Sequence, residues 1–575
     1  MSAHVALFLL LLSIAACSKP EQHSLVERLA ILPFELLSGE GETDRVGPAL
    51  LSSALSQVPN LDAIQVDSIP QAYARHANRL LHTYGTGRGG KLQLQAEIED
   101  AASHKMLRSM RVDGGATAGL APLVARLAKG INSAAKPGNS PSPAAYKQLN
   151  RAFAATDAAA QDEAFQSAIQ ADPHFGVAYV SWVRALLGRG ELQRAADIAD
   201  KGRAASLDDS SQANLTYLGA RAIQDRGAQI SALKKLTALA PAVSENYEHL
   251  AELQFGARQF AESAAAYGQA LRLDPDNGGL ENMRGYAEGF AGNLEQARQA
   301  LKKYVDEAPE QRANALDSLG EVDFSAGDFA GAEAAFLAAQ QKNPAGTEWL
   351  KAAQARLMTG DLSGADQIFG RFAKGPSVYQ RAQWEFLTGR RKSALAKIQA
   401  EAAQSHGDGA ALLWAQAAVW QLQTGDRAGA NVSAKNILLQ PASPGRNSVG
   451  GLVQFLLADG SHSSGSPLVD ALAALFQQDF QKALPLLEQA YARTTPPTDG
   501  QVRILLAWAN VETGHFDRAK ELLRIIPIPM ASGDPMFTSL IFPRFFAVRA
   551  AILTRDGKQA EAQRDQKLFS QYSGN

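Results

Sequence analysis

The sequence has almost no cysteine: Cys17 is the single cysteine among 575 residues. One thiol cannot form a disulfide within the chain, and no second cysteine is present to help hold a zinc ion. Net charge is also nearly absent, with 56 lysines and arginines against 58 aspartates and glutamates. Because no large positive field surrounds such a chain, we do not expect nucleic acid as a partner.

The usual signatures of catalysis are missing as well. The ten histidines form no His-Glu-x-x-His zinc motif, and neither Ser53 nor Ser206 lies in a Gly-x-Ser-x-Gly elbow. Residues 85–90 do spell Gly-x-Gly-x-x-Gly. A dinucleotide loop must follow a strand and open a helix, whereas these glycines follow a helical pattern and lead into a strand, so we interpret them as a turn or flexible connection. We therefore expect no enzyme, no cofactor and no metal.

What the chain does contain is a regular spacing of proline. In the series Pro173, Pro241, Pro275 and Pro309 the last two gaps are equal, and the first gap is twice as long. A fixed period of roughly 34 residues is typical of a small unit that is copied along the chain and stacked on its neighbours, which share one continuous core. Proline ends a helix because it cannot continue the hydrogen-bond ladder.

Each unit reads as two antiparallel helices joined by a short turn. Between Ser244 and Pro275 the apolar residues fall at helical spacing on two segments that are broken near Gly256. Alanine and glycine recur where the helices must touch, with a large residue one turn away. The same pattern, with uneven lengths, predicts ten to twelve hairpins from about Ser142 to the end of the chain.

This pattern resembles the tetratricopeptide repeat (TPR) family. The match is direct in three stretches, which are Phe165-Ala168-Pro173, Tyr267-Ala270-Pro275 and Phe336-Ala339-Pro344. The resemblance implies a mainly α fold, a TPR-type α-solenoid of helical hairpins. We place one solenoid block at residues 144–459, a break at 460–467 and a second block at 468–575; Pro441–Gly451 reads as loosened chain just before the break.

The amino terminus reads as an export signal. Val5–Leu12 is an apolar run of signal-peptide length, too short to span a bilayer comfortably, and Ser13-Ile14-Ala15-Ala16-Cys17 follows it. This sequence resembles the lipobox of bacterial lipoproteins, although the usual Lys or Arg at the start is missing. We predict a signal peptide at residues 1–16 and a tether at 17–26. A free or buried cysteine after an ordinary signal is the alternative.

The lipoprotein resemblance implies acyl chains on Cys17, and more than one chain gives stable membrane anchoring. Ser18, in place of Asp, follows the cysteine. By the sorting rule of that family this implies a lipid-anchored protein of the cell envelope, on the periplasmic face of the outer membrane.

Residues 27–137 read as a small α/β domain. Strand patterns occur at 29–34, 63–66, 92–98 and 106–112, and helical patterns at 49–55 and 120–131. The phrase Ile31-Leu32-Pro33-Phe34-Glu35 and Pro59-Asn60-Leu61 resemble the amino-terminal domain of TolB and related bacterial regulatory proteins. A helix and a third strand of that family, expected before Lys91, are not recognisable in the sequence. Residues 138–143, rich in Pro and Ser, predict a linker.

If the solenoid resembles other TPR proteins, its first helices line a concave groove. Carrying the family's groove positions onto three repeats selects six residues: Glu248, Glu252, Asn282, Tyr286, Asp317 and Glu321. Such an acidic strip suits a neutral or basic segment of a partner and not a carboxylate tail. The alternative is that these residues are ordinary solvated polar positions on helices.

These features predict a non-enzymatic, lipid-anchored periplasmic scaffold that binds protein or peptide partners in envelope assembly or secretion. The alternative is a signalling or sensory subunit, in which the α/β domain binds a ligand or partner and the repeat array assembles or transmits.

Overall fold

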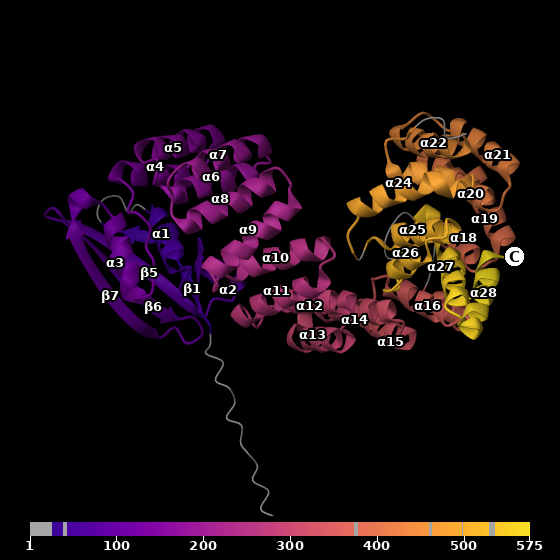
Figure 1. The fold of residues 1–575 in the computed structure, drawn as a ribbon, viewed down its shortest axis with the longest axis horizontal. Coiled ribbons are helices and arrows are strands. Elements are labelled where there is room, and N and C mark those ends of the chain that lie inside the picture. The colour runs from indigo at the N-terminus through magenta and orange to yellow at the C-terminus, as the bar shows by residue number, and fades with distance from the viewer. Residues whose placement is uncertain are drawn as a thin grey trace, which may run out of the picture. The chain divides into compact units, whose positions relative to one another are not determined.

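The structure is a computed structural model that describes residues 26–37, 43–372, 378–458, 463–496, 498–527 and 535–574 (Figure 1). The predicted signal peptide and Cys17 lie outside these residues. The chain divides into two compact units. The first unit comprises Met1–Tyr247 with Arg272–Pro275, and the second comprises Glu248–Leu271 with Asp276–Asn575.

The first unit opens with a seven-stranded mixed sheet. Its strands are β1 (Glu27–Ile31), β2 (Phe34–Leu36), β3 (Thr43–Asp44), β4 (Leu61–Gln65), β5 (Arg79–Arg88), β6 (Lys91–Asp100) and β7 (Met106–Gly115). Strand β1 lies between β4 and β5 and is parallel to both, while β5, β6 and β7 form an antiparallel meander. Pro33 separates β1 from β2 because it has no N–H for the ladder, and β2 then pairs with β5 further along.

Alternating side chains of the sheet enter two separate cores. Leu29 and Ile31 point to the face covered by α1 (Val46–Leu55) and α3 (Ala121–Ile131). Ala30 and Leu32 point to the opposite core, which includes Ala72 of α2 (Ile69–Ala74). This is the period of two that a strand imposes on its side chains. The predicted strands and helices of this domain are therefore confirmed as elements.

Two expectations about the same domain are wrong. The helix and strand that were missing before Lys91 are present as α2 and β5. The glycine-rich stretch 85–90 does not follow a helix, because its first four residues belong to β5. Gly89 and Gly90, with φ of 58° and 76°, make the tight hairpin turn into β6. Positive φ at both positions matches the twist of the flanking strands, and glycine adopts it at little cost.

Helical hairpins fill the rest of the first unit. Residues 135–142 form neither helix nor strand, and Pro143, the last residue of the predicted linker, is the first residue of α4. The hairpins are α4 (Pro143–Ala154) with α5 (Ala158–Ala171), α6 (Gly176–Gly188) with α7 (Leu192–Ala204), and α8 (Asp209–Ala222) with α9 (Arg226–Leu239). Two more helices, α10 (Ser244–Gly256) and α11 (Phe260–Leu273), are divided between the two units: most residues of each belong to the second unit.

The second unit continues the same arrangement. Its hairpins are α12 (Gly278–Ala291) with α13 (Leu294–Glu307), α14 (Arg312–Ala326) with α15 (Phe329–Lys342), α16 (Glu348–Met358) with α17 (Leu362–Phe372), α18 (Val378–Leu387) with α19 (Arg391–Gln404), α20 (Gly407–Gln423) with α21 (Arg427–Leu438), α23 (Pro467–Phe476) with α24 (Phe480–Arg493), α25 (Gly500–Glu512) with α26 (Phe516–Leu522), and α27 (Pro535–Arg555) with α28 (Gln559–Ser573). A single helix, α22 (Pro444–Leu457), follows α21. It occupies a stretch that the sequence analysis read as loosened chain, and Ser443 caps it by accepting from the Arg446 N–H.

The sequence period appears in the backbone conformation. Gly190, Gln224, Arg258 and Gly292 follow one another at the repeat period, and each lies in the turn of a hairpin with φ between 57° and 95°. The prolines mark the other ends, since α5, α9, α11, α13 and α15 each stop two residues before one. The predicted helix stops are confirmed.

Helix α27 lies among the hairpins of the second unit. It packs against α18, α20 and α25, although several other helices separate it from α18 and α20 in the sequence (Figure 1). Trp420 donates from Nε1 to Ser539 Oγ at 3.0 Å, and Phe542 is fully buried. Met536, Phe537 and Ile541 are buried as well, so the start of α27 helps to fill the core of the second unit.

Candidate functional site

The six predicted groove residues lie on three successive first helices of the second unit. Glu248 and Glu252 are on α10, Asn282 and Tyr286 on α12, and Asp317 and Glu321 on α14. The structure brings the last two helices into direct contact here, because the Tyr286 hydroxyl donates to Glu321 Oε2 at 2.7 Å. Whether these residues bind a partner remains a prediction.

A lysine outside the predicted strip compensates part of its charge. Lys351 of α16 donates from Nζ to Asp317 Oδ2 at 2.7 Å and to Glu321 Oε1 at 2.6 Å. Burial lowers the pKa of Lys351, but Glu321 and Asp317 outweigh it and raise that pKa above its ordinary value. Burial also raises the pKa of Asp317, against the effect of Lys351. The strip on α14 is therefore partly charge-compensated, with one cation facing two carboxylates.

The repeat period would have revealed this lysine. Asn282 stands one period after Glu248, and Lys351 stands one period after Asp317. Lys351 is thus the next residue of the same groove position. Extending the six residues by one more repeat would have added a cation to the predicted acidic strip.

On α10 the acidic character persists. Glu252 is exposed, whereas Glu248 is half-buried. Burial first, and then the nearby Glu252 and Glu248, raise the pKa of the buried Tyr267 hydroxyl on α11. The Asn282 Oδ1 atom is buried and accepts no hydrogen bond within the described chain. Glu252 is the one of the six predicted side chains that is exposed, and the others are half-buried or buried.

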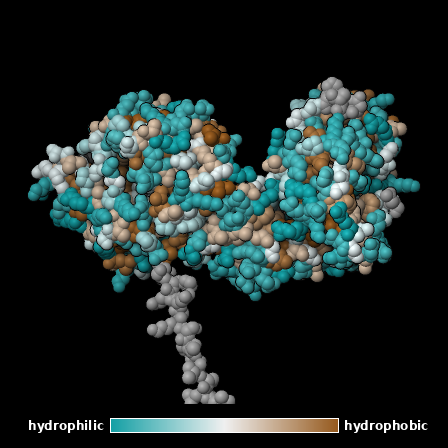
Figure 2. Space-filling model, in the orientation of Figure 1, coloured by the Kyte–Doolittle hydropathy of each residue, from teal (hydrophilic) through white to brown (hydrophobic). Residues whose placement is uncertain are grey.

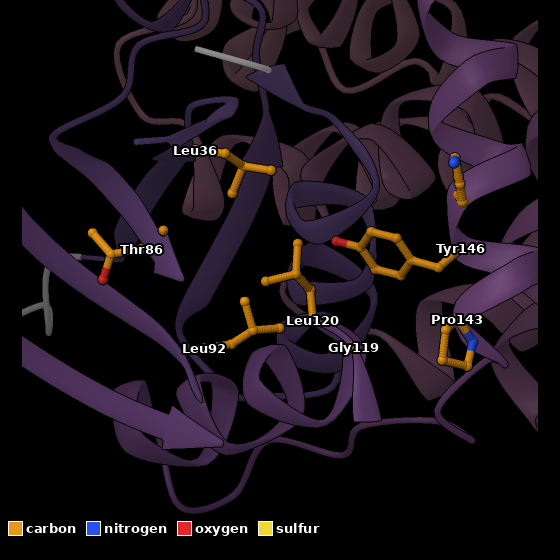
Figure 3. A pocket seen from close by; sticks show the side chains of 9 residues that line it. Leu36, Thr86, Leu92, Gly119, Leu120, Pro143 and Tyr146 are labelled. Carbon is orange, nitrogen blue, oxygen red and sulfur yellow. The ribbon is translucent and has the colours of Figure 1, made fainter. Parts of the chain in front are cut away.

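A second feature is a pocket in the first unit, between the sheet and the first hairpin (Figure 3). Its volume is about 270 Å³, and its walls include Leu36, Leu92, Leu120 and Tyr146. The Tyr146 hydroxyl donates to Asp44 Oδ2 at 2.6 Å, and burial raises the pKa of both groups. A small apolar molecule of few atoms is the ligand that such walls suit.

A buried ionic network joins the sheet to the later helices of the first unit. Arg28 Nη1 of β1 lies 3.1 Å from Asp274 Oδ2 and 3.7 Å from Asp62 Oδ2. Ser244 donates from Oγ to Asp62 at 3.0 Å, and His76 Nδ1 lies 3.0 Å from Asp274 Oδ1. Burial raises the pKa of Asp62 despite Arg28. All these groups are used in mutual contacts, so the network is structural.

Other site classes find little support in the part of the chain that the structure describes. No group of three or more His, Cys, Asp or Glu side chains there is arranged to hold a metal. One helix, Met536–Arg555, is long and apolar enough to cross a membrane, but 67% of it is buried within the protein, as in the core helix of a globular domain. Figure 2 shows a mainly hydrophilic visible face with scattered apolar residues.

Comparison with known proteins identifies the repeats. Models of the tetratricopeptide repeat family match residues 250–312 and 450–536. No curated protein matches the chain. The seven-stranded sheet is compatible with the TolB-like resemblance of the sequence.

Several solved structures are similar to parts of this chain, each at low identity and with a low TM-score. The crystal structure of PilW, a widely conserved type IV pilus biogenesis factor, is 14% identical over 35% of this chain and 93% of that chain, with a TM-score of 0.29. A tetratricopeptide repeat protein from Parabacteroides merdae ATCC 43184 is 18% identical over 43% of this chain and 98% of that chain, with a TM-score of 0.28. The structure of Naa15/Naa10 bound to HypK-THB is 14% identical over 74% of this chain and 75% of that chain, with a TM-score of 0.33.

Proposed function

Because this chain is a tetratricopeptide-repeat protein, we propose that it is a scaffold that holds protein or peptide partners at the bacterial cell envelope. The observation that supports it most is the repeat array itself, since TPR folds serve protein–protein interaction and are generally non-catalytic.

The groove suggests the chemistry of the partner. The exposed Glu252 gives α10 a negative charge, while Lys351 partly compensates the two carboxylates of α14. A neutral or basic segment is the complementary ligand, and it would contact α10 more strongly than α14.

A charge reversal tests this binding surface. Glu252→Lys reverses an exposed charge without disturbing the core, and Glu262→Lys on α11, also exposed, is the matched control. After mild crosslinking in the native host and affinity capture, Glu252→Lys should recover less partner than wild type or Glu262→Lys. Equal recovery from both variants would contradict the assignment of this surface. Glu321 is unsuitable for reversal because it is buried and bonded to Tyr286 and Lys351.

The location rests on the amino-terminal sequence. We propose that Cys17 is lipidated and anchors the chain to the periplasmic face of the outer membrane. Metabolic labelling with a fatty-acid analogue should mark the wild type and not Cys17→Ser, and fractionation should find the variant released from the membrane. A labelled Cys17→Ser protein, or equal membrane retention, would contradict the proposal.

A sensory role is the second candidate, favoured by the pocket of about 270 Å³ between sheet and first hairpin. A ligand there would contact both the α/β domain and α4. A metabolite that raises the unfolding temperature of the full chain should lose its effect in Leu92→Trp, which fills the pocket. If Leu92→Trp responds like the wild type, the ligand binds elsewhere and this role loses its support.

A further inference from the structure

A larger pocket lies within the second unit, where α27 and α28 meet α19. Its volume is about 420 Å³, and its walls include Arg391 and Lys392 at the start of α19, Gln423 at the end of α20, and Arg544 on α27. A pocket of this volume is in the range of small-molecule sites. Neither the scaffold function nor the predicted groove uses it.

Neither arginine is paired with an acidic side chain among the described residues. Within the described residues, no Asp or Glu oxygen lies at ion-pair distance from Arg391 or Arg544. Their guanidinium groups face aromatic rings instead: Arg391 Cζ lies 5.1 Å from the Phe386 ring centre, and Arg544 Cζ lies 4.2 Å from that of Trp508. The nearest acidic influence on Arg544 is Glu512, which accepts from Trp508 Nε1.

Two other arginines of the second unit, one buried and one half-buried, are each paired with a carboxylate. Arg503 contacts Asp499 at 3.1 Å, and Arg549 contacts Asp565. Burial, and then repulsion from Arg544, lowers the pKa of Arg391 to about 10, and burial lowers that of Arg544. With no acidic side chain of the described residues beside them, holding two such cations close together costs free energy in the empty pocket.

Unused donors accompany the charges. Arg391 Nε and Gln423 Nε2 are buried and donate to no acceptor within the described chain. The Gln423 Oε1 atom accepts from Ser539, which leaves its amide nitrogen available. Helix α19 also lacks a side-chain cap at its amino end, where its dipole favours negative charge. Together these groups supply what an oxyanion needs: positive charge and several donors.

We infer that this pocket binds a small organic acid, with its carboxylate or phosphate between Arg391 and Arg544 and an apolar body against Leu395, Leu540 and Phe569. The apolar walls distinguish this site from a surface cluster of basic residues, since they exclude water from the ion pair and accommodate a hydrocarbon or aromatic group.

Binding of four probes to the full chain tests the inference. Octanoate and octyl phosphate carry the two candidate head groups, octanol lacks the charge, and inorganic phosphate lacks the apolar body. In calorimetric titration at least one of the two acids should bind, and octanol and inorganic phosphate should bind at least tenfold more weakly. Which acid binds more tightly distinguishes a carboxylate ligand from a phosphate ligand.

Two variants locate the binding. Arg391→Gln and Arg544→Gln should each weaken the acid at least tenfold, whereas Arg381→Gln, an exposed arginine on α18, should bind like the wild type. Without ligand, both pocket variants should unfold at the same temperature as the wild type or a higher one, because each loses an unpaired desolvated cation. An unchanged or higher unfolding temperature shows that weaker binding does not result from a loss of folding. Octanol binding as tightly as the acids, or unchanged acid binding by both pocket variants, would overturn the inference.

Discussion

At the scale of single residues, the same contact joins neighbouring hairpins in two places. Asp162 of α5 accepts from Trp182 Nε1 at 2.9 Å and from Arg189 Nη2 at 2.7 Å. Asp366 of α17 accepts from Trp384 Nε1 at 2.7 Å, again with an arginine beside it. A carboxylate on the second helix of one hairpin thus fixes the indole of the next, and charged hydrogen bonds of this kind are stronger than neutral ones.

This contact predicts a pH-dependent loss of stability in Asp162→Asn. Burial raises the pKa of Asp162, but hydrogen bonds from Arg194, Arg189 and Trp182 outweigh it and hold the pKa below its ordinary value. The stabilisation is therefore complete above the ordinary pKa of about 4 and is lost as the pH falls through the lower folded value. The variant should be destabilised by about 1–3 kcal/mol at pH 7.

Denaturant unfolding of both proteins at pH 7 and in acid measures this difference. The gap between wild type and Asp162→Asn should close as the pH falls below about 4. A gap that is the same at every pH would mean that shape, and not charge, matters at this site.

The hairpin turns give a second prediction at this scale. Gln224 has φ of 57°, whereas glycine occupies the equivalent position at Gly190 and Gly292. A residue with a side chain costs about 1 kcal/mol in this left-handed conformation. Glycine avoids that cost, and the conformational entropy that it loses on folding offsets only part of the gain. Gln224→Gly should therefore raise the unfolding free energy by up to about 1 kcal/mol, and Gly190→Ala should lower it by about the same amount. Opposite signs in thermal unfolding confirm the reasoning, and a destabilised Gln224→Gly would contradict it.

At the scale of elements, one buried arginine connects the sheet to the helices of the first unit. Arg28 is 5% exposed and faces Asp62 and Asp274, which are also buried. Strand β1 carries the arginine at the start of the described chain, whereas Asp274 follows α11, after the first four hairpins. Such a network specifies one way of packing the α/β domain, because its charges are satisfied only together.

Removing this cation should therefore be costly. Arg28→Met leaves buried carboxylates without their counter-ion and should destabilise the first unit by about 3–5 kcal/mol. Arg79→Met is the control, since Arg79 pairs with the more exposed Asp100 in the same sheet and should cost about 1 kcal/mol or less. Hydrogen exchange of β1, β4 and α10 measures the effect. Equal hydrogen exchange in the two variants would show that the buried network stabilises the first unit no more than the more exposed Arg79–Asp100 pair does.

At the scale of the second unit, the array does not behave as an open solenoid. In an open solenoid each repeat contacts only its neighbours. Here Tyr572 donates to the Leu357 carbonyl at 2.7 Å, and Arg258 donates to the Thr494 carbonyl at 3.0 Å. These contacts join hairpins that are far from each other in the sequence. Together with the central position of α27, they close the hairpins around a shared core.

This closure predicts that damage to α27 spreads. Phe542→Ala removes a fully buried ring and should cost about 3–5 kcal/mol. Hydrogen exchange should then rise in α16, α18 and α20 as well as in α28. Leu301→Ala is the matched control, because its buried neighbours are local to α12–α14, and its effect should stay there. A Phe542→Ala effect confined to α27 and α28 would contradict the closed arrangement.

Much of the fold follows from local properties of the sequence. Proline stops, small residues at helix contacts and glycine turns act within a few residues, so the hairpins and their period could be predicted. Strand β5 was missed because Gly85 and Gly87 interrupt its apolar pattern, and α22 because it contains three glycines and a proline. At both positions tertiary packing outweighs local propensity.

The candidate sites, like the fold, were determined in part by the sequence and in part by the tertiary structure. The repeat spacing alone determined which residues share the groove position, but it says nothing of charge balance between helices. Three features were decided only by the tertiary structure. Lys351 pairs with both Asp317 and Glu321, α27 lies among earlier hairpins, and Arg391 and Arg544 meet in one pocket. The physical reason is that burial and ion pairing depend on groups brought together from distant parts of the chain, whereas helices and turns depend on neighbours.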